Sequence, residues 1–235
     1  MAKKISSILA DLEQFNNESI VEIQLPSNQQ IKKFKPISVY QQKNIIGKLS
    51  SNPIDNVVLI NSLNSIITDN CTDDASEIST FDRELILLVL KDNDEAKEQV
   101  AAVVAKLKEI DASYLLTDEL NFEGKLIIEI AIPSLERDSE FNAAFIDEYK
   151  ANNAAPNVIA SNYFVHELVK HIKVIRMQND AEVFDKVEDL AAYAKIVEKL
   201  PAKINNKIAK FIAQSKQVIE KLFVEYNLTT QTPLF

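Results

Sequence analysis

The sequence predicts an α+β protein that is predominantly α-helical, with a small antiparallel sheet packed by helices and a helical C-terminal module. Strands are indicated by an alternating segment that occurs twice, as VEIQLPS at 21–27 and as IEIAIPS at 128–134. Its apolar residues occupy every second position, as a half-buried strand requires, because successive side chains face opposite sides of a sheet. Proline then ends the pairing because it lacks a backbone donor. Most of the remaining chain has apolar residues at helical spacing, which predicts helices around these strands.

Helices are predicted where apolar residues recur every three or four positions and capping residues mark the ends. In chain order they span residues 4–15, 39–49, 53–67, 81–90, 95–110, 139–150, 156–177, 183–200 and 203–226. Ser38 and Thr80 are suitable N-caps, and Pro156 is suited to the first turn of a helix. The run at 81–90 is apolar nearly throughout, so we expect this helix to be central.

Two hairpins complete the expected elements. Residues 31–35 are placed to return as the partner of a strand at 19–25, after turn residues at 26–28. Residues 120–128 read as a second hairpin, with its turn at Glu123 and Gly124. After Pro133 the sequence predicts helices only.

These elements divide into two modules. Residues 1–150 form a mixed α+β module with the two similar strands that end in Pro-Ser, and residues 151–235 form a helical module with a C-terminal tail. The polar stretch at 151–156 is the best linker candidate. The similarity of the two strands favours neighbouring positions in one small sheet.

Composition excludes several classes of function. The net charge of −9 argues against broad nucleic-acid binding, which needs a cationic surface. The chain has two glycines, so neither a P-loop nor a dinucleotide-binding loop can be assembled, and Cys71 is the only cysteine, so no intrachain disulfide or cysteine-based zinc site is expected. No apolar run reaches the length that a membrane span needs, and acidic residues follow the basic N-terminus too early for a signal peptide. We therefore expect a cytoplasmic site of synthesis and no membrane partner.

No catalytic, cofactor-binding or metal-binding residues are predicted. His166, Glu167 and His171 invite comparison with zinc proteases, but the histidines are five positions apart, about 140° around a helix, whereas a zinc pair is four apart. Asp73 and Asp74 lie in an acidic stretch that lacks the central glycine of a calcium loop, which favours a solvated loop.

Partner contacts are predicted in the C-terminal helix and tail. Phe211, Leu222 and Phe223 belong to one apolar stripe of the helix, and Leu234 and Phe235 form an apolar tip after a polar stretch. Lysines populate the other side of this helix, a pattern typical of a solvated face and less often of a contact with an acidic partner.

Four segments in this order resemble baseplate hub and hub-assembly proteins of T-even-type contractile-tailed bacteriophages. They are EIQLPS at 22–27 with FKPI at 34–37, FDRELILL at 81–88, ELVKHIKVI at 167–175, and IVEKLP at 196–201. Two departures stand out: Leu90 is followed by Lys91 and Asp92 where the family usually continues into an arginine, and cysteine pairs near the C-terminus are missing. A metal role of the family therefore does not carry over.

The resemblance implies a non-enzymatic subunit that helps to build the central hub of the tail baseplate through contacts with other phage baseplate or tail proteins. Such a protein would be assembled in the host cytoplasm and found in the virion tail baseplate. One alternative is a tail-assembly chaperone that is absent from the mature virion. A further alternative, from another class, is a metal-dependent enzyme that uses the acidic loop.

Overall fold

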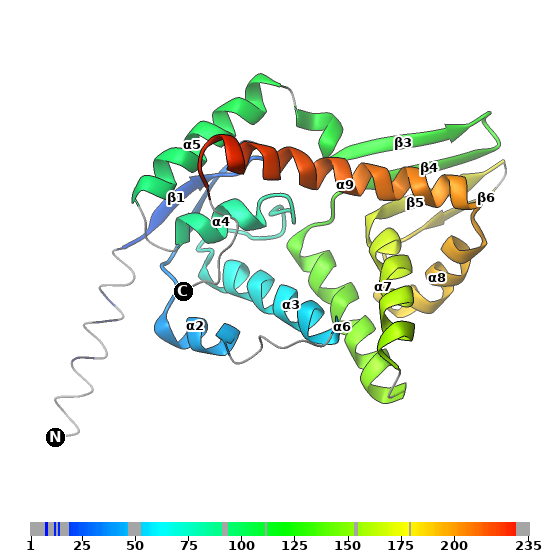
Figure 1. The fold of residues 1–235 in the computed structure, drawn as a ribbon, viewed down its shortest axis with the longest axis horizontal. Helices are drawn as coiled ribbons and strands as arrows, with labels where there is room; N and C mark the ends of the chain where they lie inside the picture. Colours follow the sequence, from blue (N-terminus) through cyan, green and yellow to red (C-terminus); the bar gives the residue numbers. More distant parts are fainter. Residues whose placement is uncertain are drawn as a thin grey trace.

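The computed structural model describes residues 8, 12, 14, 19–46, 53–90, 94–110, 112–152, 155–178 and 180–228. Its longest helix, α9 (Ala202–Glu225), runs across most of the molecule in Figure 1. One end of α9 lies beside the strands β3 to β6, and the other end lies beside α5. The predominantly helical α+β class predicted from the sequence is confirmed, with two antiparallel sheets of two and four strands.

The first sheet is the predicted N-terminal hairpin. Strand β1 (Val21–Gln24) pairs with β2 (Ile31–Phe34), with Val21 opposite Phe34. Phe34 is buried, and so is Leu25 directly after β1, because the alternating pattern turns these side chains to the core. The predicted cap of the next helix, α2 (Val39–Ile46), is also confirmed. Ser38 Oγ accepts from the backbone N–H of Gln41, and the Gln41 side chain accepts from the backbone N–H of Ser38.

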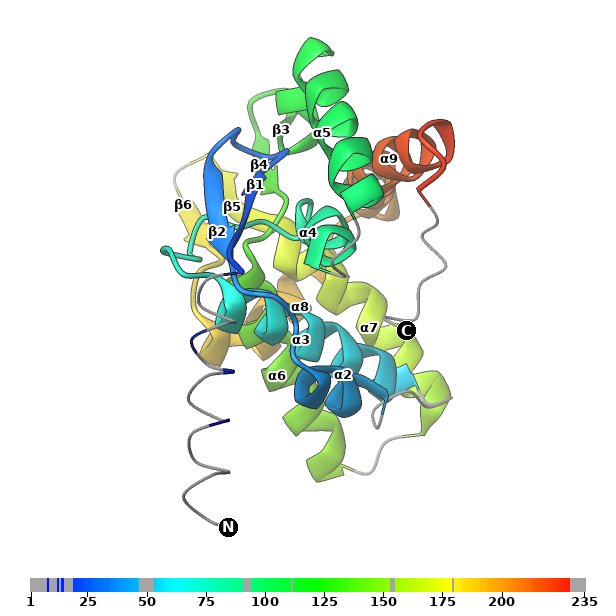
Figure 2. The ribbon, with the colours of Figure 1, turned by 90° about the vertical axis from the view of Figure 1, so that its left-hand side faces the viewer.

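Three helices follow, and the middle one is central as predicted. They are α3 (Pro53–Asn70), α4 (Arg83–Leu90) and α5 (Asp94–Glu109). Five of the eight residues of α4 are buried. The predicted start of this helix is wrong by two residues, because α4 begins at Arg83. Ile86 N–H donates to the carbonyl of Asp82, so Asp82 and not Thr80 stands at the N-cap. Figure 2 shows α5 beside α9 above α4, and apolar residues of these three helices share one core cluster.

The second sheet has the order β3-β4-β5-β6 and begins with the predicted hairpin. After a short 3-10 helix, η1 (Ala112–Leu115), strand β3 (Thr117–Phe122) pairs with β4 (Leu126–Ala131). The turn is where the sequence placed it. Glu123 and Gly124 both have positive φ, and Lys125 N–H bonds to Phe122, which is the geometry of a hairpin turn that matches the strand twist.

The other two strands were not expected. Helix α6 (Leu135–Asn152) is followed by α7 (Pro156–His171), which begins at the predicted proline but ends six residues early. The chain continues as β5 (Ile172–Met177) and β6 (Asp180–Val183), so the prediction of helices only after Pro133 is wrong. Ile172, Val174 and Ile175 are β-branched and pair with β4, and this neighbour decides between helix and strand. A 3-10 turn, η2 (Val187–Asp189), and α8 (Leu190–Lys199) lead to α9.

Two large apolar clusters form the core, and α9 contributes to both. Its first half packs with β4, β5, α7 and α8, and its second half packs with the β1–β2 hairpin, α4 and α5. Strands β4 and β5 also pair across residue 150. The predicted boundary at that residue therefore runs through a continuous sheet and does not separate two cores.

The two strands that end in Pro-Ser are not neighbours in one sheet, which corrects that expectation. β1 belongs to the two-stranded sheet, and β4 belongs to the four-stranded sheet. Among the described residues, no helix combines the length and apolar character needed to cross a membrane.

Candidate functional site

The two Pro-Ser ends nevertheless meet at one place, the segment before α4. Asp82 is fully buried there, and its carboxylate accepts hydrogen bonds from the backbone N–H (2.8 Å) and the hydroxyl (2.6 Å) of Ser27. It also accepts from the backbone N–H (3.0 Å) and the hydroxyl (2.9 Å) of Ser79. Burial raises the pKa of Asp82, and the four donors act against this rise. The first Pro-Ser end is thus held by a single buried acid.

The second Pro-Ser end binds the same segment through the backbone. Thr80 N–H donates to the carbonyl of Pro133 at 2.9 Å, and Leu135 N–H donates to the carbonyl of Ile78 at 2.8 Å. Ser134 Oγ then accepts from the N–H of Arg137 and caps the first turn of α6. Both strands that end in Pro-Ser therefore terminate beside the same loop, residues 78–82. One strand precedes this loop in the chain, and the other follows it.

Next to this loop lies a buried network of charges that we call the ion network: Arg83, Asn64, Asp138, Lys170 and Glu167. It joins α3, α4, α6 and α7. The Lys170 ammonium donates to Asp138 at 2.7 Å and pairs with Glu167. Arg83 pairs with Asp138 at 3.3 Å and donates to Asn64 at 2.9 Å, while Asn64 donates to Asp138 at 2.8 Å. The side chains of Asp138 and Lys170 are 4% and 2% exposed, so these charges depend on one another for stabilisation.

The electrostatics of the ion network favour ionised carboxylates. Burial acts to raise the pKa of Asp138, but the charges of Lys170 and Arg83 outweigh it and hold the pKa well below its usual range. Burial also acts to raise the pKa of Glu167, but the charge of Lys170 outweighs it and the pKa is lowered to about 2. Burial, together with the neighbouring Glu167, raises the pKa of Tyr163 far above its ordinary value. Each of the two acids is therefore charged at neutral pH and paired within the chain.

His171 bonds to Glu167 of this network, His166 is linked to Lys170 through Asn142, and both rings are neutral at pH 7. His171 Nδ1 lies 2.7 Å from the carbonyl oxygen of Glu167, which can only accept, so we assign the ring hydrogen to Nδ1. His166 Nε2 lies 3.1 Å from the side-chain oxygen of Asn142, which also accepts from Lys170, so we assign the hydrogen to Nε2. Burial, with the nearby ammonium of Lys170, lowers the pKa of His166 to about 3. Burial also lowers the pKa of His171, to about 4.

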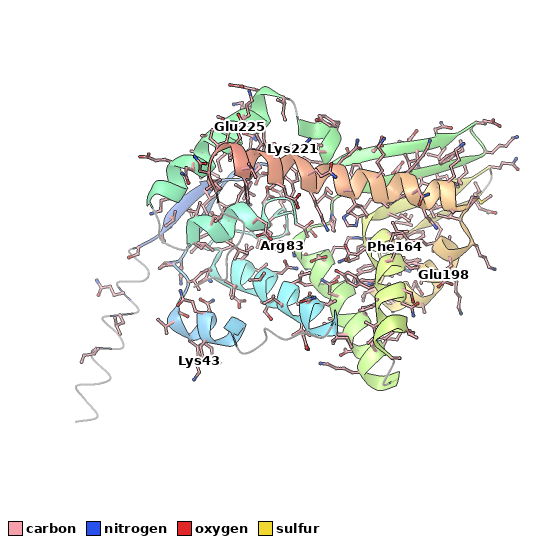
Figure 3. The ribbon with its side chains drawn as sticks, viewed as in Figure 1. Lys43, Arg83, Phe164, Glu198, Lys221 and Glu225 are labelled. Atoms are coloured by element: carbon pink, nitrogen blue, oxygen red, sulfur yellow. The ribbon has the colours of Figure 1, made fainter. Side chains whose placement is uncertain are left out.

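A cavity of about 640 Å³ lies between α3, α4 and α9, beside the ion network. We call it the α9 cavity. Apolar walls come from Ile60, Leu63, Phe81, Ile219 and Phe223. Its polar lining includes Arg83 and His171 and, at the exposed rim, three charged side chains: Glu84, Lys216 and Glu220. In Figure 3 Arg83 lies in the middle of the molecule, below α9. The size and the mainly apolar lining are typical of a pocket that takes a small ligand or a few side chains.

The predicted partner-binding residues of α9 belong to the protein's own core. Phe211, Leu222 and Phe223 are 6%, 7% and 1% exposed and lie within the two large apolar clusters. They are therefore not on the surface of the chain, because the stripe that the sequence shows is covered by the sheet and by α4 and α5. Leu234 and Phe235 lie outside the described residues, and their contact with a partner stays a prediction.

The acidic loop is occupied by contacts to its own neighbours. Asp73 accepts from the backbone N–H of Lys33 at 2.9 Å, and Asp74 accepts from both the backbone and the hydroxyl of Ser76. Hydrogen bonds from Ser76 lower the pKa of Asp74. Burial raises the pKa of the Cys71 thiol at the start of this loop. In the part of the chain that the structure describes, no three His, Cys, Asp or Glu side chains are grouped so that they could hold a metal ion.

Sequence reasoning missed the ion network. A signal was present, since Lys170 follows Leu168 and Val169 and precedes Ile172 in a strongly apolar stretch, where an unpaired charge would be costly. Its partner Asp138 is 32 positions away, and nothing in the sequence pairs the two. Exposed apolar residues were missed too: Val39 and Tyr40 on α2 are 80% and 72% exposed.

Comparison with known proteins adds no assignment. No protein-family model matches the chain, and searches of curated proteins and of solved structures find no match either.

Proposed function

We propose that this chain is a structural or assembly subunit of the tail baseplate hub of a contractile-tailed bacteriophage, and that it acts through contacts with other baseplate or tail proteins. The observation that carries the proposal is that the four segments that resemble hub proteins are joined to one another. Ser27 of the first segment bonds to Asp82 of the second. Arg83 of the second is linked through Asp138 to Lys170 of the third.

The fourth segment joins the same framework through apolar contacts. Val197 lies in one core cluster with Leu168, Val169 and Ile172 of the third segment. Residues of the four segments thus take part in the contacts that join the hairpin, α4, α7 and α8. Buried ion pairs give little net stability, but breaking them is costly, so they favour one arrangement of the helices over others. A fixed arrangement suits a protein whose surface must match several neighbours.

Contact sites on the surface are also available. Val39 and Tyr40 are exposed side by side in sequence at the start of α2, and Val224 on α9 is 77% exposed. Aromatic residues are enriched at protein interfaces because they bury a large area and lose little conformational freedom. We therefore infer that α2 takes part in contacts with a hub partner, in a protein assembled in the host cytoplasm and located in the virion baseplate.

The test is mass spectrometry of purified virions together with electron microscopy of tails made without this protein. The proposal expects peptides of the chain in virions and tails that lack a complete hub when the chain is missing. Absence from virions with defective tails would instead identify the tail-assembly chaperone. Normal, infectious particles made without the chain would refute both roles.

A matched pair of variants tests the inferred contact. Tyr40→Asp and Lys43→Asp both change exposed positions of α2, and Lys43 is labelled on that helix in Figure 3. We expect Tyr40→Asp to lower incorporation into baseplates and Lys43→Asp to leave it unchanged, with equal thermal stability of the two purified proteins. Equal incorporation of both variants would remove α2 from the interface. The alternative of a metal-dependent enzyme is tested by metal analysis of the natural chain and of the double variant Asp73→Asn with Asp74→Asn. If neither protein holds a bound ion, that alternative is refuted.

A further inference from the structure

The chain continues for seven residues beyond Leu228, after the helix that forms one wall of the α9 cavity. One wall of the cavity is α9 itself, from Ile212 to Val224. At 1.5 Å per residue, this wall is about 18 Å long. The end of the wall lies four residues before Leu228, where the described part of the chain stops. The sequence TTQTPLF at 229–235 follows Leu228 directly.

The end of α9 turns the chain back on its own helix. Leu228 N–H donates to the carbonyl of Phe223 at 2.7 Å, Asn227 N–H donates to the carbonyl of Val224 at 3.2 Å, and Asn227 has a φ of 55°. This is a Schellman motif, in which a residue in the left-handed region reverses the chain after the helix. Leu228 is buried in the same cluster as Phe223, which lines the cavity. The last described residue is therefore buried in a cluster that also contains a residue of the cavity wall.

The length and composition of the segment fit the cavity. The six residue-to-residue steps from Leu228 to Leu234 span up to about 20 Å when extended, which is about the length of the wall. Its first residues are polar and its tip, Leu234 with Phe235, is apolar. The segment carries no charged side chain, whereas Glu84, Lys216 and Glu220 place charges of both signs at the rim of the cavity.

We propose that residues 229–235 dock in the α9 cavity of their own chain, with Leu234 and Phe235 against the apolar walls formed by Ile60, Leu63 and Phe81. An occupant tethered by so short a linker is present at an effective concentration in the millimolar range, which favours it over a free partner of equal affinity. Docking covers apolar walls that otherwise face water. This inference concerns the chain alone and does not depend on the proposed role in the baseplate. It is an alternative to the predicted contact of Leu234 and Phe235 with a partner.

A single tryptophan can report on the tip, because the chain contains none. Phe235→Trp places the reporter at the apolar tip, and Thr230→Trp places it in the polar part as the control. We expect the emission of Phe235→Trp to be blue-shifted and its quenching by acrylamide to be several-fold weaker than that of Thr230→Trp. Emission and quenching of Phe235→Trp equal to those of free tryptophan would overturn the proposal.

A second pair of substitutions locates the docking site. Ile60 lines the cavity and Leu59 does not, although both are half-buried residues of α3. Added to Phe235→Trp, Ile60→Glu should expose the tryptophan, whereas Leu59→Glu should not. A tryptophan that stays protected in Ile60→Glu places the tip elsewhere and refutes the site. Protection that increases with protein concentration would assign the cavity to the tail of a second copy, which also refutes docking within the chain.

Discussion

Acidification from about pH 7 to about pH 5 should destabilise this protein through its two buried histidines. His166 and His171 have pKa values of about 3 and about 4 in the fold, against an ordinary value of 6.5. In this interval the unfolded chain binds protons at both positions, while the folded chain leaves both rings neutral. The unfolded state therefore gains protons that the folded state does not, and the free energy of unfolding falls as the pH falls.

The size of the effect follows from the two titrations. One proton bound only in the unfolded state is worth about 1.4 kcal/mol per pH unit. Because the unfolded titration is centred at 6.5, each histidine accounts for about 2 kcal/mol over the interval, and the two together for about 4 kcal/mol. The lowered pKa values of Asp138 and Glu167 add to the loss only below their ordinary values of 3.8 and 4.5. Asp82, whose pKa is raised, acts in the opposite sense.

The assay is urea denaturation at both ends of the interval, on the natural chain and on His166→Gln with His171→Asn. These substitutions keep a donor for Asn142 and for the Glu167 carbonyl, and they leave a chain without histidine, since it has only two. Asp82 contributes equally to both chains and cancels in the comparison. We expect the double variant to lose about 4 kcal/mol less than the natural chain. An equal loss in both would refute the reasoning, because the histidines would then not be the groups that titrate.

Two further predictions concern packing. Lys170→Met leaves Asp138 and Glu167 buried without their shared ammonium, so it should lower the free energy of unfolding by about 3–5 kcal/mol in urea denaturation. Adding Asp138→Leu to this variant should recover part of the loss. Strictly additive losses for the two substitutions would mean that Lys170 and Asp138 do not interact. Leu222→Asp should lower the free energy of unfolding by more than about 3 kcal/mol, because it puts a charge into the core. Val224→Asp, at an exposed position of the same helix, should change it by less than about 0.5 kcal/mol. Similar thermal midpoints for the two variants would contradict the burial of Leu222.

The elements predicted correctly are those whose signals are local. Gly124 marks its turn because glycine adopts a positive φ without a steric penalty, and Ser38 with Gln41 forms a capping box within four residues. Pro156 begins α7 because its fixed φ suits the first turn of a helix. The sequence also predicted the apolar stripe of α9, but helical spacing of apolar residues does not tell whether the chain itself or a partner covers the stripe. Its coverage by the sheet, α4 and α5 depends on contacts between distant parts of the chain.

The errors arose where distant neighbours decide. Residues 172–177 suit a helix and a strand about equally well, and they form β5 because β4 offers an edge with unpaired backbone groups. The two Pro-Ser strands share a sequence but not a sheet. Lys170 and Asp138 meet only because α6 and α7 pack face to face.

By itself, the sequence determined that most of the helices and turns exist and where several of them begin, because helical spacing, caps and turn residues act within a few positions of one another. Only the tertiary structure decided that the stripe of α9 is core, that the two Pro-Ser ends converge on the segment before α4, and that α4, α6 and α7 share a buried set of charges. These features depend on desolvation and on pairing between residues far apart in the chain. Both are properties of the packed molecule, and a local pattern of residues does not contain them.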